Sequence, residues 1–526
     1  MDTKALRQKV LDLAIRGKLV PQNPNDEPAS VLLERIRQQK QQMVKDGKLK
    51  AKDIKNDTVI FVGEDNLHYE KFADGSVKCI EDEIPFDLPD GWAWTRLQSI
   101  TSVLTDGTHK TPKYSDDGYI FLSSRNVTSG KIDWDNIMYI PESLHQELYT
   151  RLAPKVGDIL LAKNGTTGVA AIVDREEVFD IYVSLALIRI VGNVVDPLYV
   201  LRAIGSSYIQ EYFDSSLKGI GVPNLHLEHI RKTLLPIPPY SEQGRIVSRA
   251  DMLLPLVEDI ADDEKELYRL VSVSKAKILD LAIRGQLVPQ DPTDEPASVL
   301  LERIRAEKEE LVRQGKIKRD RKESVIFRGE DNSYYEKIGK VTACIDSELP
   351  FELPADWCWC RLGSICTSIQ YGLSNSAEPR GTHRLLRITD IQNGKVDWDS
   401  VPFTSVQDAG YYSLQNEDIV FARTGATVGK SYLISDIPYD TVYASYLIRI
   451  RLFNGIDARY IYDFFNSDCY WTQITSRAVG VGQPNCNGTS LGNLLVPIPP
   501  TGMQNRIITS ASSMMKCLIA IEKSLN

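Results

Sequence analysis

Three strings in this 526-residue chain resemble motifs that perform chemistry in enzymes, but each falls short of the pattern that the chemistry requires. Residues 237–240 read IPPY, similar to the Asn/Asp-Pro-Pro-Tyr/Phe motif of adenine methyltransferases, yet they lack the Asn or Asp that would accept the amino hydrogens of the base. Residues 425–431 read GATVGKS, with three residues between the glycines where a phosphate-binding loop needs four. His226 and His229 stand three apart, and we expect them to pack in a core or on the surface rather than to bind a metal. None of the three strings therefore indicates an active site.

The composition of the chain is that of a globular protein with more than one domain. It is 42% hydrophobic and 25% charged, which excludes a disordered or fibrous chain, and its length exceeds what one hydrophobic core usually organises. Its apolar stretches are far shorter than the roughly 20 residues that span a bilayer, and its first residues lack the features of a signal peptide. Its eight cysteines show neither a disulfide framework nor a zinc spacing, so we expect a reducing, cytoplasmic location. Because the net charge is −9, any positive surface for nucleic acid must be local.

A long internal repeat determines the predicted architecture. Residues 11–37 recur at 279–305 with only three differences, and the segment IPFDLPDGWAWTRL at 84–97 recurs as LPFELPADWCWCRL at 349–362. Beyond these tryptophans the two halves diverge into variable bodies but keep common landmarks. The landmark pairs are 130–134 with 394–398, 158–159 with 418–419, 187–190 with 447–450, 221–224 with 482–485, and 236–239 with 497–500. Two variable bodies in one shared frame suit a duplicated reader better than a single active site.

The repeats also occur in circular order. The segment that begins at Gln504 aligns with the segment that begins at Gln243, and apolar residues such as Leu253, Val257 and Ile260 follow at helical spacing. By these alignments both chain ends fall inside what is, in the middle of the chain, one continuous helical segment. We therefore predict that the two termini pack side by side, as in a two-unit ring that is cut within one unit.

The elements that position these bodies are long helices and short strands. Residues 240–288 are predicted to be helical with a kink at Pro255, which corresponds to a length on the order of 70 Å. An acidic residue and a proline before residues 29–37 and 297–305 predict a helix start at each place. The bodies contain short β-branched and aromatic runs separated by Gly, Asn and Asp turns, so we predict an α+β fold for them.

The bodies open with Leu-Pro-x-x-Trp-x-Trp-x-Arg-Leu, close with Pro-Ile-Pro-Pro, and alternate with near-identical helical spacers. In these features nearly the whole chain resembles the specificity subunit of a type I restriction–modification system. The resemblance implies two α+β target recognition domains, separated by long antiparallel repeated helices with a pseudo-two-fold relation. Each domain would read one half of a bipartite double-stranded DNA target, and the helices would fix the gap and dock two methylation subunits. It also implies a non-catalytic chain without a cofactor, since S-adenosylmethionine, ATP and Mg belong to partner subunits, and motor/restriction subunits join the full complex.

This resemblance predicts seven segments along the chain. They are an N-terminal repeated helical segment at 1–37, a connector at 38–85, target recognition domain 1 at 86–240, a central helical spacer at 241–305, a second connector at 306–350, target recognition domain 2 at 351–501, and a C-terminal helix at 502–526 that packs with the N-terminal segment. The long connectors depart from the family pattern. They carry lysines and arginines that could follow the phosphate backbone, enlarge the partner surface, or form an ordinary solvated face: Lys45, Lys48, Lys50, Lys52 and Lys55 in the first, and Lys316, Lys318, Arg319, Arg321 and Lys322 in the second.

Polar side chains on Gly- and Pro-bounded loops of the two bodies are the DNA-binding candidates, because base edges are read through hydrogen bonds in the grooves. In domain 1 they are Thr108, His109, Lys110, Arg125, Asn126, Lys163, Asn164, Thr166, Lys218 and Asn224. In domain 2 they are Tyr371, Ser374, Arg387, Arg423, Thr424, Thr427, Arg477, Gln483 and Asn485. The alternative interpretation of each is a solvated loop or a structural turn, and for Arg387 a salt bridge at a strand end.

Two other functions remain open from the sequence. One is a combined restriction or methylation enzyme, which would need a Gly-rich cofactor motif and an Asn-Pro-Pro-Tyr motif. The other is a scaffold that holds partner subunits without reading DNA, which would bind random and target duplexes equally at every salt concentration.

Overall fold

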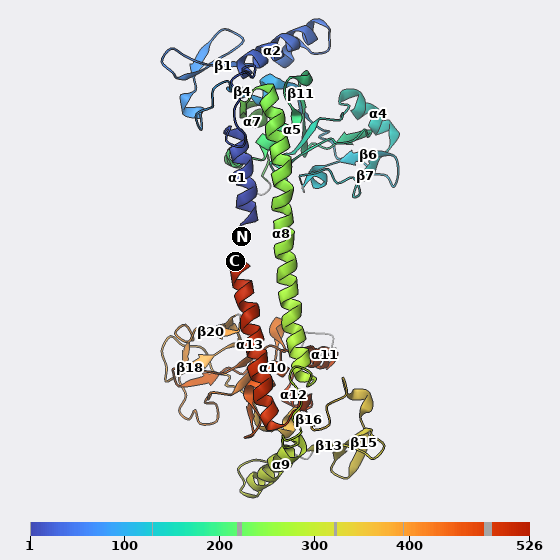
Figure 1. The fold of residues 1–526 in the computed structure, drawn as a ribbon, viewed down its shortest axis with the longest axis vertical. Helices are drawn as coiled ribbons and strands as arrows, with labels where there is room; N and C mark the ends of the chain where they lie inside the picture. The colour runs from blue at the N-terminus through green and yellow to red at the C-terminus, as the bar shows by residue number, and fades with distance from the viewer. Residues whose placement is uncertain are drawn as a thin grey trace. The chain divides into compact units, whose positions relative to one another are not determined.

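The chain folds into two compact units, Met1–Asp263 and Glu264–Asn526, drawn in Figure 1. The structure is a computed structural model and describes residues 2–128, 130–217, 223–319, 323–392, 394–477 and 486–525. None of the helices in these ranges is long and apolar enough to cross a membrane. The two units are described one at a time.

Unit 1 combines helices with short strands. Its helices are α1 (Thr3–Ile15), α2 (Ala29–Lys45), α3 (Ala51–Ile54), α4 (Glu142–Arg151), α5 (Pro197–Ile204), α6 (Ser207–Ser215), α7 (Leu227–Lys232) and the first part of α8 (Tyr240–Ile283). Its strands are β1 (Val59–Val62), β2 (His68–Lys71), β3 (Val77–Cys79), β4 (Ala93–Arg96), β5 (Thr101–Asp106), β6 (Tyr119–Leu122), β7 (Met138–Ile140), β8 (Ile159–Ala162), β9 (Ala170–Ile172), β10 (Phe179–Ile181), β11 (Leu185–Ile190) and β12 (Leu234–Ile237).

The centre of unit 1 is a four-stranded antiparallel sheet in the order β5-β11-β8-β9. Since side chains alternate along a strand, Ile159 and Leu161 of β8 face a core that includes α5 and α6, whereas Leu160 and Ala162 face a second core beside the sheet β10-β6-β7. Both faces of the central sheet are therefore covered. This explains why β8 consists only of buried apolar residues.

Unit 2 repeats this plan. Its elements are the second part of α8, then α9 (Ala297–Arg313), β13 (Ser324–Arg328), β14 (Tyr334–Ile338), β15 (Val341–Cys344), β16 (Cys358–Arg361), β17 (Cys366–Tyr371), β18 (His383–Leu386), β19 (Ile391–Gln392), β20 (Lys395–Val396), β21 (Phe403–Thr404), β22 (Ile419–Ala422), β23 (Ser431–Leu433), β24 (Thr441–Tyr443), β25 (Leu447–Leu452), α10 (Ala458–Phe464), α11 (Asp468–Arg477), α12 (Gly488–Gly492), β26 (Leu495–Ile498) and α13 (Thr501–Leu525). The central sheet is β17-β25-β22-β23, in the same order as its counterpart in unit 1. The predicted α+β class is thus confirmed for both bodies.

Each connector contains a small three-stranded antiparallel sheet. The first forms the antiparallel sheet β1-β2-β3 and the second forms β13-β14-β15. A half-buried arginine holds each sheet to the strand that follows: Arg96 pairs with the buried Glu70 at 2.8 Å, and Arg361 pairs with Glu336 at 2.8 Å. A buried lysine adds a second link, since Lys40 of α2 lies 2.5 Å from Asp57. The connectors are therefore packed parts of each unit rather than free linkers.

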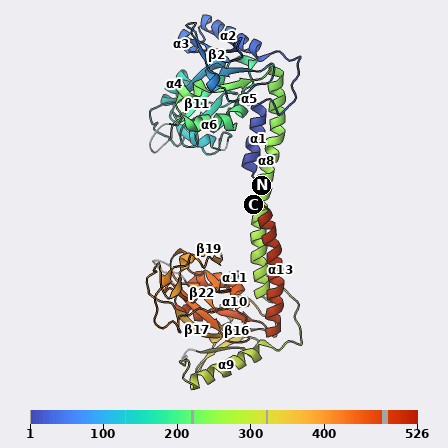
Figure 2. The same cartoon turned by 90° about the vertical axis from the view of Figure 1, so that its left-hand side faces the viewer.

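Long helices pack along each unit, as Figure 2 shows. In unit 1 Leu11 of α1 packs against Leu254 of α8, and in unit 2 Lys275 of α8 pairs with Glu522 of α13 at 2.6 Å. Helix α8 runs through Pro255 and ends at Ile283, a few residues earlier than predicted. Gly285, two residues beyond this end, has a φ of +69°, which is outside the helical region. A Cβ at this position would lie 2.8 Å from Trp357, so only glycine fits there. The helix starts predicted after the two prolines are confirmed, with α2 and α9 beginning at Ala29 and Ala297.

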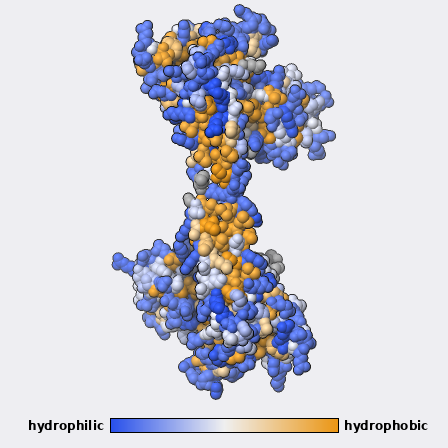
Figure 3. Space-filling view, in the orientation of Figure 1, coloured by the Kyte–Doolittle hydropathy of each residue, from blue (hydrophilic) through white to orange (hydrophobic). Residues whose placement is uncertain are grey.

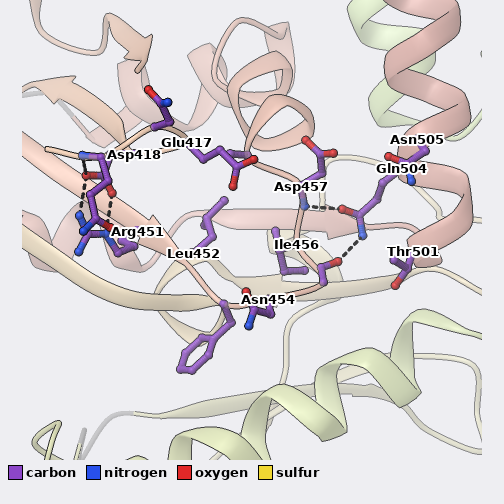
Figure 4. A pocket seen from close by; sticks show the side chains of 15 residues that line it. Glu417, Asp418, Arg451, Leu452, Asn454, Ile456, Asp457, Thr501, Gln504 and Asn505 are labelled. Carbon is purple, nitrogen blue, oxygen red and sulfur yellow. Dashed lines mark hydrogen bonds and ion pairs between the residues drawn. The ribbon is translucent and has the colours of Figure 1, made fainter. Parts of the chain in front are cut away.

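The Gln-x-Arg-Ile segments join the helices to the bodies. Gln504 accepts a hydrogen bond from the backbone N–H of Asp457 at 2.7 Å and donates one to the carbonyl of Gly455 at 3.2 Å (Figure 4). Gln243 accepts in the same way from the backbone N–H of Asp196 at 2.7 Å. The repeated glutamines thus perform the same structural task in both units, which accounts for their shared sequence context.

Candidate nucleic-acid interface

Three segments that are far apart in the sequence of unit 1 meet beyond the ends of β5 and β8. Lys163, which follows β8, places its Nζ 2.6 Å from Oδ2 of Asp106 at the end of β5. Asn164 forms a β-bridge with Asn224, and Leu225 donates its backbone N–H to the carbonyl of Lys163 at 2.9 Å. The loop after β5, the turn after β8 and the segment before α7 therefore form one surface. The short helix η3 (Ser124–Val127) adjoins it through a hydrogen bond from the Ser124 N–H to Oγ of Ser184 at 3.0 Å.

Four predicted residues of this surface are exposed. His109, Lys110, Arg125 and Thr166 face solvent. The His109 ring reaches back to Asp106, with Nε2 3.3 Å from Oδ1, whereas the Arg125 guanidinium has no ion pair within the described parts of the chain. These four side chains can present donors to a ligand without disturbing the fold.

Three predicted residues are instead buried and bound within the domain, which argues against their direct contact with bases. Thr108 forms a β-bridge with Tyr182 and is 8% exposed. Asn126 is 5% exposed; its side chain accepts from the Ser123 N–H at 2.9 Å and donates to the carbonyl of Asn136 at 3.0 Å. The ammonium of Lys163 is occupied by Asp106. A sequence pattern shows a donor but not whether the fold has already used it.

Electrostatics keep Asp106 of the Asp106–Lys163 pair in its ionised form. Burial alone would raise the pKa of Asp106, but the hydrogen bond and charge of Lys163, helped by His109, hold that pKa below its ordinary value. The aspartate therefore stays ionised and fixes the lysine at the base of the surface.

Three candidates of domain 1 remain: Asn164, Asn224 and Lys218. Asn164 and Asn224 are half-buried, and Oδ1 of Asn224 is buried without a hydrogen-bond partner among the described residues. Lys218 lies outside the described residues.

The same three segments meet in unit 2 with different chemistry. The structure places Tyr371 and Arg423 at the positions of Asp106 and Lys163, because β17 and β22 pair with β25 in the register that β5 and β8 use with β11. The Arg423 guanidinium lies over the Tyr371 ring, 4.7 Å from its centroid. The Tyr371 hydroxyl accepts from the Gly488 N–H at 2.8 Å. A cation–π pair thus replaces a carboxylate–ammonium pair.

The remaining candidates of domain 2 fall into three groups. Ser374 is exposed, and Thr424 and Thr427 are half-buried in the turn after β22. Arg387 pairs with Asp390 through Nη2 at 2.6 Å and Nε at 3.1 Å, so the salt bridge weighed from the sequence is present. Gln483 and Asn485 lie outside the described residues, and the side chain of Arg477 is likewise not described.

One landmark of the sequence alignment is wrong by two residues. The motif LIRI at 187–190 was matched with LIRI at 447–450, but Arg189 pairs with Asp158 at 2.6 Å and Arg451 pairs with Asp418 at 2.7 Å; Figure 4 shows the second pair. The true counterpart of Arg189 is therefore Arg451. A shift of two residues keeps every side chain on the same face of a strand, so alternation cannot reveal it.

The corrected register shows a residue that the sequence interpretation missed. Arg449 occupies the position of Leu187, which is fully buried in an apolar core of unit 1. One feature of the sequence could have identified this residue: Arg449 and Arg451 stand two positions apart, which places two cations on one face of β25.

Comparison with known proteins gives consistent matches. A family model described as "Type I restriction modification DNA specificity domain" matches residues 89–261 and 354–526. The chain is 30% identical to the type I restriction enzyme EcoAI specificity subunit of Escherichia coli and 27% identical to the EcoEI specificity subunit of the same species; each match covers 98% of this chain and 89% of the relative. Among solved structures, one described as "Structural basis underlying complex assembly and conformational transition of the type I R-M system" matches with a TM-score of 0.52 and 17% identity, over 84% of this chain and 94% of the other. The last match supports the fold.

Proposed function

The chain belongs to the family of type I restriction–modification DNA specificity proteins, and on this basis we propose that it is the DNA-recognition subunit of such a system. Each of its two recognition domains reads one half of a bipartite duplex target. The observation that carries the proposal is the recurrence of one three-segment surface in both units, with an Asp106–Lys163 pair in the first and a Tyr371–Arg423 pair in the second. Two domains with the same fold but different side chains at the binding surface suit a target whose two halves differ in sequence.

The exposed side chains are the proposed contacts with DNA. Arg125 can bridge guanine, and His109, Lys110 and Thr166 can donate to bases or phosphates. In domain 2 the proposed contacts are the exposed Ser374 and Tyr371 and the half-buried Arg423 that lies over Tyr371. Thr108, Asn126 and Lys163 act as positioning residues, because their polar groups hold the loops in place.

The long helices are the proposed docking surface for methylation subunits. In unit 1 Met252 and Leu256 of α8 are 62% and 56% exposed. In unit 2 Val273 of α8 and Met514 of α13 are 52% and 42% exposed, and Figure 3 shows apolar surface over much of α13. Exposed apolar patches of this kind mark protein–protein contacts. We propose two methylation subunits as occupants, with S-adenosylmethionine, ATP, Mg and any motor or restriction activity on partner chains and no catalysis on this one.

A methylation map tests the proposal. The chain is co-expressed with the methylation subunit encoded beside it in a methylation-free host, and the DNA is sequenced for N6-methyladenine. A split motif with a fixed gap is the expected result, and exchange of domain 1 alone should change one half of the motif.

Other outcomes of this experiment lead elsewhere. If the subunits co-purify but no motif is methylated, the chain is a scaffold. If the purified chain methylates DNA by itself, it is an enzyme. Either result overturns the proposal.

A further inference from the structure

A large polar cleft in unit 2 lies between the second connector and the recognition domain. It has a volume of about 1210 Å³ and is lined by the end of α9 and the loop after it, by β13 and β14, and by β17 and β25. Six basic and two acidic side chains line it. Both acids are already paired, Glu323 with Lys308 at 3.2 Å and Glu336 with Arg361 at 2.8 Å. The lining therefore carries an excess of positive charge.

Arg449 is the most unusual of these cations. It is 3% exposed, yet its guanidinium hydrogen-bonds only neutral groups: the Ser413 carbonyl at 3.0 Å, Oε1 of Gln370 at 2.9 Å and Oγ of Ser368 at 3.4 Å. It also lies 5.7 Å from the centroid of the Tyr443 ring. Its buried Nε has no hydrogen-bond partner among the described residues.

The Asp418 carboxylate favours the charge of Arg449 at a distance but forms no hydrogen bond or ion pair with it in the described part of the chain. Asp418 binds Arg451 through both of its oxygens, at 2.7 Å each. Burial lowers the pKa of Arg449, and the charge of Arg451 adds to the shift, while the charge of Asp418 opposes it without cancelling it. A buried charge of this kind is costly unless a counter-ion is present.

The recognition fold does not require this arginine. At the equivalent positions of unit 1, Val103, Thr105 and Leu187 replace Ser368, Gln370 and Arg449. Leu187 is fully buried, and Val103 packs against the same apolar core. The same sheet therefore forms in unit 1 without the polar trio.

The cleft is continuous with the DNA-binding surface. Tyr371, which stacks on Arg423, and Gly488, which donates to Tyr371, both belong to the lining. On the connector side the lining includes Lys316 and Lys318, which are exposed and have no ion pair within the described ranges. A duplex that contacts the loops of domain 2 would bring its backbone to these residues.

We propose that this cleft binds a phosphate group, with Arg449 as its buried anchor and Lys316 and Lys318 as exposed contacts, and that the phosphate belongs to the backbone of the duplex held by domain 2. The inference rests on the proposed DNA-recognition function and gives the second connector a role, as one wall of the DNA-binding site. Domain 1 lacks the anchor, so this contact is specific to the second half-site.

The test measures binding of the full chain to a duplex of random sequence between about 50 and 200 mM salt. Each backbone phosphate that a protein neutralises contributes about 0.9 to the slope of log affinity against log salt. Arg449→Leu, which installs the residue of unit 1, should lower the slope by about 0.9 and weaken binding about fivefold to tenfold at low salt. The double variant Lys316→Ala/Lys318→Ala should lower the slope by up to about 1.8. As it changes only exposed side chains, it keeps the test valid if Arg449→Leu does not fold.

A second arm distinguishes the source of the phosphate. The full chain is titrated with inorganic phosphate at constant ionic strength, and the same variants are compared. Phosphate that binds wild type, does not bind Arg449→Leu and competes with the duplex supports the inference. Phosphate binding that depends on Arg449, together with an unchanged DNA slope in both variants, identifies a free-anion site and overturns the DNA assignment.

Two further outcomes are decisive. Folded variants that bind both duplex and phosphate like wild type leave Arg449 as a purely structural residue and overturn the inference, while the recognition function stands. A wild-type chain that binds no DNA at any salt concentration refutes the proposed function itself.

Discussion

The two recognition domains share a frame but not a binding chemistry. In both, an arginine on the central strand binds an aspartate that is nearly inaccessible, Arg189 with Asp158 and Arg451 with Asp418. Beyond the ends of the same strands, however, one domain has a lysine–aspartate pair where the other has arginine over tyrosine. Because the interior arginine–aspartate pair and the apolar faces of the sheet occur in both domains, we infer that these shared features maintain the fold. The positions at the strand ends are therefore free to differ between domains.

The largest expected effect comes from breaking the shared frame. Asp158→Ala leaves the Arg189 guanidinium without its partner and should lower the free energy of unfolding of unit 1 by about 3 kcal/mol. Hydrogen exchange should show lost protection in β5, β8 and β11 and unchanged protection in β17, β22 and β25. Asp418→Ala is the matched control and should give the reverse pattern. A loss below about 1 kcal/mol in both variants would show that these pairs do not hold the frame.

The next effect comes from exchanging the chemistry at the strand ends. Asp106→Tyr/Lys163→Arg gives domain 1 the pair of domain 2. Because the original pair positions the loops that carry the proposed contacts, the exchange should lower methylation at the first half-site by an amount equivalent to about 2–3 kcal/mol. The second half of the motif should be unchanged in the methylation map. Tyr371→Asp/Arg423→Lys is the reciprocal variant and should affect the second half only. If either variant alters both halves equally, the two domains do not read independently.

A smaller difference is expected between Arg125 and Arg387, which lie two positions apart in the equivalent turns after β6 and β18. Arg125→Ala should weaken binding to the methylated motif by about 1–2 kcal/mol without changing stability, because this exposed guanidinium is available to a base. Arg387→Ala should instead act mainly on stability, by about 0.5 kcal/mol, since its guanidinium is already bound to Asp390. Fluorescence anisotropy with target duplex and urea unfolding measure the two quantities. If both variants weaken DNA binding equally, the ion pair of Arg387 with Asp390 does not keep this arginine from binding DNA, and the prediction is wrong.

The last expected effect depends on pH and concerns the link between the first connector and its body. Burial raises the pKa of Asp57 to about 6, although Lys40 opposes the shift. Between its unfolded value near 4 and about 6, the folded state therefore holds a proton that the unfolded state does not hold. This contribution to stability increases as the pH falls from 7 to 5, by about 1 kcal/mol.

Comparison with Asp57→Asn measures this contribution. The free energy of unfolding of wild type, relative to that of this variant, should be about 1 kcal/mol larger at pH 5 than at pH 7. Glu323→Gln, which changes the acid that pairs with Lys308 in the second connector, is the matched control for the other unit. A difference between wild type and Asp57→Asn that does not change with pH would contradict the shifted pKa.

The sequence by itself determined the repeat, the α+β class, the helix starts and the family. Repetition, hydrophobic alternation and the residues around a helix start are local properties, so they can be read along the chain. The predicted segment boundaries and the adjacency of the termini remain predictions. The lysine and arginine runs of the connectors were also visible, but not what these side chains face.

Only the tertiary structure decided which donors are available and which the fold has used. Lys163 lies 57 positions from Asp106 along the chain, and Arg449 lies 79 positions from Gln370; no local pattern connects such pairs. Strand register posed the same problem, because a shift of two residues preserves alternation. The sequence alignment therefore pairs Arg449 with Arg189, whereas its structural counterpart is the apolar Leu187. Side-chain availability depends on long-range packing, which is why exposed Arg125 and buried Asn126, neighbours in sequence, have different roles.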